Sequence, residues 1–301
     1  MRIAVLSDVH ANAEALASVL HDIHKIEPPM DELWYLGDLF GYGPRPWACF
    51  RMLVGEGVRI DRWVIGNHDR AVLEVVDCLS RNLSDSAVIQ RVAGLVPGRE
   101  ERLTVEAHAK QLKLMLDRFG SEDEKGFWGQ FRNLPTWRVT EQGIVIAHGG
   151  ILKEPEQTEN LKYYCDSPHT VRDCADKALG LGYRWAERML MLVGHTHQQA
   201  AWACRMDRRG GAQQLVVDLP LCIVVGQEYP LYPDGVVGMV LNPGSVGQPR
   251  TEDGDHRAAY MILDLSRCTV QFRRTEYDIQ QTIADMTPWY EAHRDRLVDG
   301  R

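Results

Sequence analysis

Hydrophobic residues in this chain fall into short runs that alternate with amphipathic segments. The first run, I-A-V-L-S at 3–7, is typical of a buried strand. Apolar residues then recur at helical spacing over 16–23, where Asn12 is placed to cap a helix and Pro28-Pro29 to end it. The alternation continues with strands over 32–36 and 62–65, separated by a helix over 49–54. This order predicts an α/β sheet with crossover connections.

The strand signal disappears between Ala71 and about Leu134. Ser84-Asp85 is placed to begin one helix, and an apolar stripe over 112–119, followed by Gly120, marks another. We interpret the segment from about residue 71 to about residue 134 as a helical insertion within a single domain that spans 1–301.

The second half of the chain returns to strands. A strand over 143–147 is followed by a helix that begins at Ser167-Pro168 and ends at Gly180, and by a strand over 188–193. Closely spaced runs of strand character then occur at 215–217, 222–225, 236–241, 259–263 and 269–272. Their spacing predicts hairpins and therefore an antiparallel portion. A last helix, over 279–286, is stopped by Pro288.

Composition narrows the class of protein. The 301 residues are 45% hydrophobic and 25% charged, as in ordinary globular domains. The formal net charge of −8 leaves no basic surplus to neutralise phosphates, which disfavours nucleic-acid and anionic-membrane binding. The 7 cysteines include no C-x-x-C pair and favour reduced thiols. Because no apolar run has signal-peptide or membrane-spanning length, we predict a cytoplasmic protein.

Five of the apolar runs end in side chains that bind metals. These ends carry Asp8 and His10, then Asp38, then Asn67 with His68 and Asp69, then His148, and finally His195 with His197. Because the carboxyl ends of strands in an α/β sheet lie along one edge, we expect these groups to converge. Each motif alone is more typical of a turn or a cap, but coincidence at all five ends is a poor explanation.

The types of side chain in this set indicate the class of metal. Carboxylates, imidazoles and one amide fit Mn, Fe or Zn, and also Ni or Co, whereas calcium needs more oxygen ligands and structural zinc usually takes cysteine. The set is too large for one ion. Two ions about 3.5–4 Å apart need a bridging carboxylate, and such a pair clamps the attacking and leaving oxygens of a phosphoryl displacement.

The ordered motifs D-x-H, G-D, G-N-H-D, H and G-H-x-H resemble those of the calcineurin-like metallophosphoesterase superfamily. The stretches S-D-V-H-A-N, G-D-L-F-G-Y-G-P and N-P-G-S-V-G-Q-P-R at 242–250 resemble its small prokaryotic phosphodiesterase-like branch. The resemblance implies a mixed α/β fold, with a two-sheet sandwich flanked by helices, and a two-metal site. It also implies hydrolysis of a small phosphodiester or nucleotide.

Carried over position by position, the resemblance assigns roles to individual residues. One metal would be held by Asp8, His10, Asp38 and His197. The other would be held by Asn67, His148 and His195, with Asp38 bridging the two. A metal-bridging hydroxide would be the nucleophile, and His68 would protonate the leaving alkoxide or stabilise phosphate charge. Asn12 and Arg250 are candidates for binding substrate phosphate, although a solvated loop arginine is the more common reading of Arg250.

Two features separate the chain from the protein Ser/Thr phosphatase branch. Gly41-Tyr42-Gly43 stands where that branch has a second Asp and an Arg, and Asp69 stands where it has Glu. Protein phosphatase activity is therefore not expected, and Asp69 is interpreted as a support residue. The sequence leaves open a dinucleoside polyphosphate hydrolase and a non-catalytic binding scaffold of the same fold. It does not indicate the oligomeric state or the partner that orients His68.

Overall fold

The first apolar run forms strand β1 (Arg2–Leu6), which is buried on both faces in this computed structural model. Ile3 and Val5 face one hydrophobic cluster, and Ala4 and Leu6 face another. Because successive side chains of a strand point to opposite faces, a strand between two layers must be apolar throughout. Strand β1 therefore separates a sheet–sheet core from a sheet–helix core.

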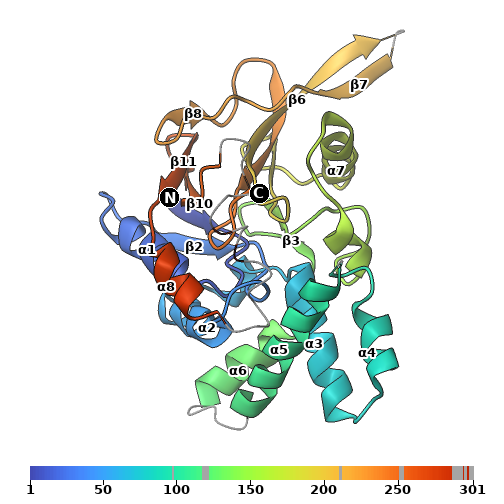
Figure 1. Cartoon of the computed structure of the whole chain (residues 1–301). Helices are drawn as coiled ribbons and strands as arrows, with labels where there is room; N and C mark the ends of the chain where they lie inside the picture. Colours follow the sequence, from blue (N-terminus) through green and yellow to red (C-terminus); the bar gives the residue numbers. More distant parts are fainter. Residues whose placement is uncertain are drawn as a thin grey trace.

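The structure describes residues 1–96, 98–116, 122–209, 212–250, 254–286, 294 and 297, and these form two facing sheets with helices outside them (Figure 1). The first sheet has the order β2 (Glu32–Tyr35), β1, β10 (Ala258–Asp264), β11 (Thr269–Thr275) and β8 (Glu228–Pro230). The second has the order β3 (Trp137–Val139), β4 (Val145–Ala147), β5 (Met189–Leu192), β9 (Val236–Pro243), β6 (Gln199–Arg209) and β7 (Ala212–Val217). The two-sheet sandwich is confirmed.

Both sheets combine parallel and antiparallel pairs. Strand β1 pairs with β2 in parallel, as do β4 with β5 and β5 with β9. The hairpins β10–β11 and β6–β7 provide the expected antiparallel portion, and the β6–β7 hairpin extends away from the body of the molecule (Figure 1).

Helices cover the outer face of each sheet. The cluster behind the first sheet joins residues of α1 (Ala13–His24), α2 (Pro46–Gly55), α3 (Asn67–Ser80), α4 (Asp85–Val92), α5 (Arg99–Leu116) and α6 (Glu122–Phe131). Helix α7 (Pro168–Gly180) packs on the second sheet, and α8 (Ile279–Ala284) contacts α1. The short 3-10 helices are η1 (Ile60–Arg62) and η2 (Thr158–Lys162). None of the described helices is long and apolar enough to cross a membrane.

Several sequence-based boundaries change. The strand predicted over 62–65 is wrong except for one parallel bridge between Trp63 and Tyr35, and the strand predicted over 222–225 does not form. Strands β3 and β6 and helices α3 and α6 were not predicted. Gly120 and Pro288, the expected helix stops, lie outside the described residues. Helix α3 begins before the predicted insertion, so that Asn67 and His68 occupy its first turn. The domain assignment itself stays a prediction.

Candidate metal centre

The predicted ligand residues meet between the two sheets. Asp8 follows β1 and Asp38 follows β2 in the first sheet, whereas His148 follows β4 and His195 follows β5 in the second. Asn67 enters from the start of α3. The expectation of a single sheet edge was therefore wrong: the strand ends face one another across the sandwich. All of these side chains are buried, together with His10 and His197.

Sharp backbone turns direct the side chains into this space. Asp8, His10, Asp38, His195 and His197 have φ values of 54, 47, 59, 67 and 63°. Residues other than glycine rarely adopt this left-handed conformation, which costs roughly 1–3 kcal/mol at each position. Such strain persists only where the surrounding structure enforces it, and its concentration on one set of potential ligands supports a functional site.

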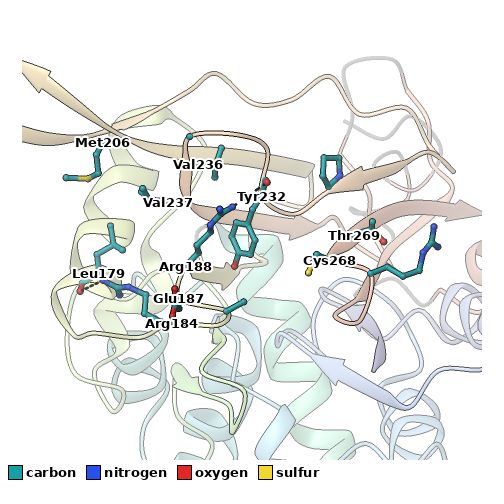
Figure 2. A pocket seen from close by; sticks show the side chains of 14 residues that line it. Leu179, Arg184, Glu187, Arg188, Met206, Tyr232, Val236, Val237, Cys268 and Thr269 are labelled. Atoms are coloured by element: carbon teal, nitrogen blue, oxygen red, sulfur yellow. Dashed lines mark hydrogen bonds between the residues drawn. The ribbon is translucent and has the colours of Figure 1, made fainter.

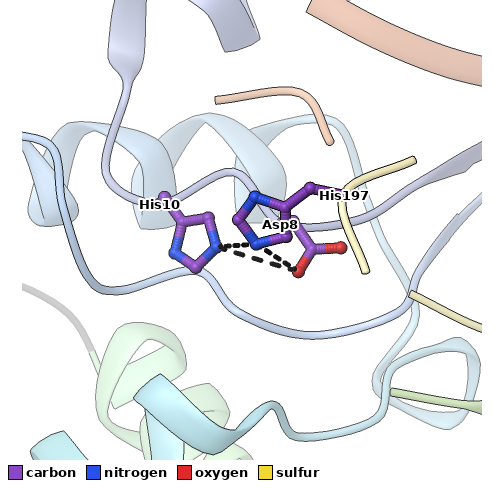
Figure 3. A group of neighbouring side chains, drawn as sticks. All are labelled: Asp8, His10 and His197. Atoms are coloured by element: carbon purple, nitrogen blue, oxygen red, sulfur yellow. Dashed lines mark hydrogen bonds and ion pairs between the residues drawn. The ribbon is translucent and has the colours of Figure 1, made fainter. Parts of the chain in front are cut away.

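Asp8, His10 and His197 form the first group of side chains (Figure 3). The Nε2 atom of His10 lies 2.9 Å from Nε2 of His197, and the Oδ1 atom of Asp8 lies 3.7 and 3.4 Å from these two nitrogens. Oδ1 of Asp8 has no hydrogen-bond partner among the described residues. Three potential ligand atoms thus point at one small volume.

Asp38, His148 and His195 form the second group. Nε2 of His148 lies 3.3 Å from Oδ2 of Asp38 and 3.1 Å from Oδ1 of Asn67. The Asn67 amide nitrogen donates to the Leu95 carbonyl at 2.7 Å, which turns its oxygen toward the group. Nε2 of His195 is buried without a hydrogen-bond partner in the described part of the chain. This group also presents acceptors to a shared space.

Hydrogen bonds behind the ligands fix which imidazole nitrogen faces the centre. Nδ1 of His10 contacts the Phe40 carbonyl at 2.9 Å, and Nδ1 of His197 contacts the Gln248 carbonyl at 2.7 Å. A carbonyl only accepts, so each Nδ1 carries the proton and each neutral ring presents a bare Nε2. Metal-binding histidines are held in this way by a second layer of acceptors. The donor set therefore fits metal ions.

Asp38 links the two groups. Its Oδ2 atom lies 3.3 Å from Nε2 of His148 and 3.8 Å from Nε2 of His10, and Oδ1 accepts the His68 backbone N–H at 2.9 Å. Gly66 stands directly against this carboxylate, and any side chain there would collide with it. A carboxylate reaching both groups is the arrangement that a bridging ligand requires.

Asp69 supports Asp38 from behind. Its two oxygens accept the backbone N–H groups of Asp38, Leu39, Phe40 and Gly66 at 2.9, 2.8, 3.1 and 3.1 Å. The side chain is fully buried and faces these amides. This is the position expected of a support residue, and it explains how the G-D and G-N-H-D motifs are joined.

The electrostatics of the centre favour cations. Burial raises the pKa of Asp8 to about 7, and the neighbouring Asp38 charge adds to the effect. Burial opposes ionisation of Asp38 as well, but the charges of His148 and His68 hold its pKa well below the usual range. Burial lowers the pKa of His148, yet Asp38 outweighs this and raises it to about 9. The negative charge that attracts a proton to His148 equally attracts a metal ion.

Burial has the opposite consequence for the remaining imidazoles. It is the largest cause of the lowered pKa values of His10, His195 and His197. Each ring is therefore held neutral. A neutral imidazole is the form that binds a metal, so these rings are ready to act as ligands without losing a proton.

His68 lies beside the first group and packs between aromatic rings. Its ring centroid is 5.0 Å from that of His10 and 4.7 Å from that of Tyr42. Gly41 backs the imidazole, since a side chain there would collide with Nδ1 of His68. Tyr42 is buried and is held between His68 and His10, which identifies it as a packing residue.

The two predicted substrate-binding residues differ in their surroundings. Asn12 caps α1 by accepting the Ala15 N–H at 3.1 Å, and it donates to the Gly247 carbonyl at 3.0 Å. Arg250 is half-buried, and its Nη2 atom lies 3.4 Å from the Tyr42 hydroxyl. Its charge lowers the pKa of the His197 imidazole, an effect second to burial. Phosphate binding by either residue stays a prediction.

His108, which is fully buried on α5, was not predicted as a site residue because its neighbours in the sequence do not resemble metal ligands. Its Nδ1 atom accepts the Gly41 N–H at 3.1 Å, and its Nε2 atom donates to the Gly43 carbonyl at 2.9 Å. One imidazole thus closes the loop that carries Tyr42 and backs His68. This contact is visible only in the folded structure, because His108 and Gly43 are 65 positions apart in the sequence.

A separate cavity of about 950 Å³ lies at the amino ends of β5 and β9, opposite the metal centre (Figure 2). Its arginines already have partners: Arg184 donates to the Leu179 carbonyl, Arg188 to the Tyr232 carbonyl, and Arg267 pairs with Glu228. None of the groups of described side chains that could hold a metal lies at this cavity, so it is no rival to the metal centre.

Comparison with known proteins places this centre in a family. The family model described as calcineurin-like phosphoesterase matches residues 1–210. The chain belongs to the calcineurin-like phosphoesterase family. It is therefore a metal-dependent phosphoester hydrolase, and the family implies divalent metal ions in a site with this ligand chemistry.

Individual relatives match the chain over all or part of its length. The phosphoesterase is 26% identical to an uncharacterized protein of Methanocaldococcus jannaschii over 93% of this chain and 89% of that one. It matches the crystal structure of a metallophosphoesterase from Sphaerobacter thermophilus with a TM-score of 0.64 and 28% identity, over 100% and 99% of the two chains. It is also 36% identical to the symmetrical bis(5'-nucleosyl)-tetraphosphatase of Shigella dysenteriae, over 57% of this chain and 47% of that relative.

Proposed function

We propose that the protein is a dinuclear phosphoesterase that hydrolyses a small-molecule phosphodiester or nucleotide, with His68 as the proton donor. One observation carries the proposal: the Asp38 carboxylate belongs to the second group of buried ligand atoms and lies 3.8 Å from Nε2 of His10 in the first. Asp8, His10 and His197 would hold one ion, and Asn67, His148 and His195 the other. The donor set of nitrogen and oxygen atoms suits Mn, Fe or Zn.

The metal ions and the protein side chains would have different roles in hydrolysis. Bound metal ions would bring the pKa of water near neutrality and neutralise charge on the phosphate. His68, next to the first group, donates a proton to the departing alkoxide, and the packing of its ring against Tyr42 and His10 keeps it in place. Arg250, whose charge already acts on the ligand His197, contributes positive charge for a phosphate oxygen.

A dinucleoside polyphosphate is the second candidate substrate. The supporting observation is the 36% identity over 174 residues to a relative named a bis(5'-nucleosyl)-tetraphosphatase. Both candidates use the same centre and differ only in the groups attached to phosphate. Hydrolysis of a panel of phosphomonoesters, phosphodiesters and dinucleoside polyphosphates, with phosphate and nucleotide as readouts, separates them.

The test of the mechanism compares adjacent residues. With an alkyl phosphodiester as substrate, whose leaving alkoxide needs a proton, His68→Ala should lower kcat by about a hundredfold or more while bound metal stays at the wild-type level. Asn67→Ala should instead lose metal. His24→Ala is the matched control, because this histidine is exposed on α1 and pairs with Glu56 at the surface. Wild-type turnover in His68→Ala would remove His68 from the mechanism.

A further inference from the structure

Tyr164 places an exposed aromatic ring directly on the metal centre. Its ring centroid lies 4.1 Å from that of His195, with the planes inclined by 36°. The residue is 42% exposed, and it is the exposed member among the Phe, Trp and Tyr side chains that the structure describes. The ring therefore covers a ligand imidazole and still presents surface to solvent.

The residues on both sides of Tyr164 are anchored by their side chains. The Tyr163 hydroxyl donates to Asp173 at 2.9 Å, and the thiol of Cys165, which is buried, contacts the Gly149 carbonyl at 3.5 Å. Gly149 and Gly150, directly after His148, let this segment approach: a side chain on Gly150 would lie 2.8 Å from the Tyr163 ring. Tyr164 is thus held at the rim by the same loop that follows a ligand.

A rigid exposed tyrosine suits one kind of ligand. A planar ring loses little conformational freedom when another ring stacks on it, and stacking of bases on aromatic side chains tolerates any base. Arg250 adds a positively charged side chain close to the centre, because its backbone N–H donates to the His197 carbonyl at 3.2 Å. A phosphate at the centre and an aromatic group beside it would be recognised together.

We infer that Tyr164 forms a stacking subsite for a nucleobase attached through its sugar to the phosphate at the metal centre. The inference rests on the proposed function for the position of the phosphate. It adds a specificity-determining residue and narrows the substrate class to nucleotides and their esters. Tyr164 takes no part in proton transfer or metal binding.

The test measures binding to the Mn²⁺-loaded protein by calorimetry, with adenosine 5'-monophosphate and ribose 5-phosphate as probes. These ligands share the phosphate and the sugar and differ in the base. Wild type should bind the nucleotide about tenfold more tightly, within the range that ring-on-base stacking supplies. Tyr164→Ala should bring the two affinities within about twofold, while Tyr164→Phe keeps the preference.

Further variants separate stacking from simple coverage of His195. Tyr164→Leu keeps apolar volume without a ring and should lose most of the preference for the nucleotide. Leu219→Ala, at a residue that is 78% exposed, is the control and should behave as wild type. Metal content and thermal unfolding, measured on every variant, show that the centre and fold are retained.

Two outcomes overturn the inference: equal or absent binding of both ligands by wild type, or an unchanged preference in Tyr164→Ala. Hydrolysis of an aryl phosphodiester, measured on the same preparation, tests the proposed function separately. If the protein hydrolyses the aryl phosphodiester but does not prefer the nucleotide, the stacking subsite is ruled out and the proposed function stands. Tyr164-dependent preference without hydrolysis supports the subsite and removes the proposed catalysis.

Discussion

The Nε2 atoms of His10 and His197 lie 2.9 Å apart, although the Nδ1 proton of each ring is committed to a backbone carbonyl. Two neutral rings in this arrangement direct lone pairs at each other, which is repulsive unless a cation lies between or beside them. The carboxylate of Asp8 faces the same point. The protein therefore holds these lone pairs and the carboxylate close together, an arrangement that a bound metal ion would stabilise.

Removal of metal should destabilise the protein. Ions that bind only the folded chain add stability by mass action, about 2.7 kcal/mol for one site at a hundredfold excess over Kd. Chelation should therefore lower Tm by roughly 5–10 °C, and Mn²⁺ should restore it. Thermal unfolding followed by circular dichroism measures the shift. His197→Ala should reduce the shift, whereas the control His24→Ala should leave it unchanged.

Substitution of ligands should change metal content in a graded way. Asp38 contacts both groups, so Asp38→Ala should leave bound metal close to zero. His197 belongs to the first group alone, and His197→Ala should leave about one ion per chain. Elemental analysis of dialysed protein gives the stoichiometry. Equal losses in the two variants would argue against Asp38 as the shared ligand.

Asp69→Asn should destabilise the protein, although it replaces none of the proposed ligands. The amide offers one oxygen, so two of the four backbone N–H groups that Asp69 now satisfies would lose their acceptor. At about 1–3 kcal/mol for each of the two buried unsatisfied groups, the free energy of unfolding should fall by about 2–6 kcal/mol. Urea denaturation measures it, and Asp218→Asn, at an exposed ion pair, is the control. A change below about 1 kcal/mol would contradict this role.

His108→Ala should lower kcat while the protein keeps its metal. The imidazole joins Gly41 to Gly43, and this loop packs against His68 through Tyr42. Losing both hydrogen bonds should cost about 3 kcal/mol of stability and, by freeing the loop, lower kcat about tenfold. Steady-state kinetics at saturating metal measure the effect. His169→Ala, at an exposed histidine on α7, controls for the loss of an imidazole. An unchanged kcat would show that His108 contributes to the stability of the protein and not to turnover.

The residues of the candidate site could be predicted because they occur in short motifs of metal-binding side chains at strand ends. Asp8, Asp38 and His148 each lie within three residues of the end of a strand, and strand ends bring distant positions together. The left-handed turns at Asp8 and His195 were not predictable, since φ there is imposed by neighbouring structure. Tyr164 and His108 carry no periodic signal, because their contacts join segments far apart in the sequence.

The strands that were missed or wrongly assigned have tertiary causes. Strand β6 is rich in Ala and Arg, which favour helices, but it is held extended by pairing with both β9 and β7. At 62–65 the ladder stops after one bridge, because the Ile65 N–H donates to the Pro135 carbonyl instead of to a strand. Val224 is 55% exposed, and an apolar run without a partner strand does not form β-structure.

We propose that two ions sharing Asp38 are required for catalysis. The most direct measurement is a titration of metal-free protein with Mn²⁺, in which hydrolysis of an aryl phosphodiester and bound metal are followed together. We expect the rate to rise sigmoidally and to level off near two equivalents per chain. A plateau at one equivalent, or an absence of hydrolysis after two ions have bound, would contradict the account.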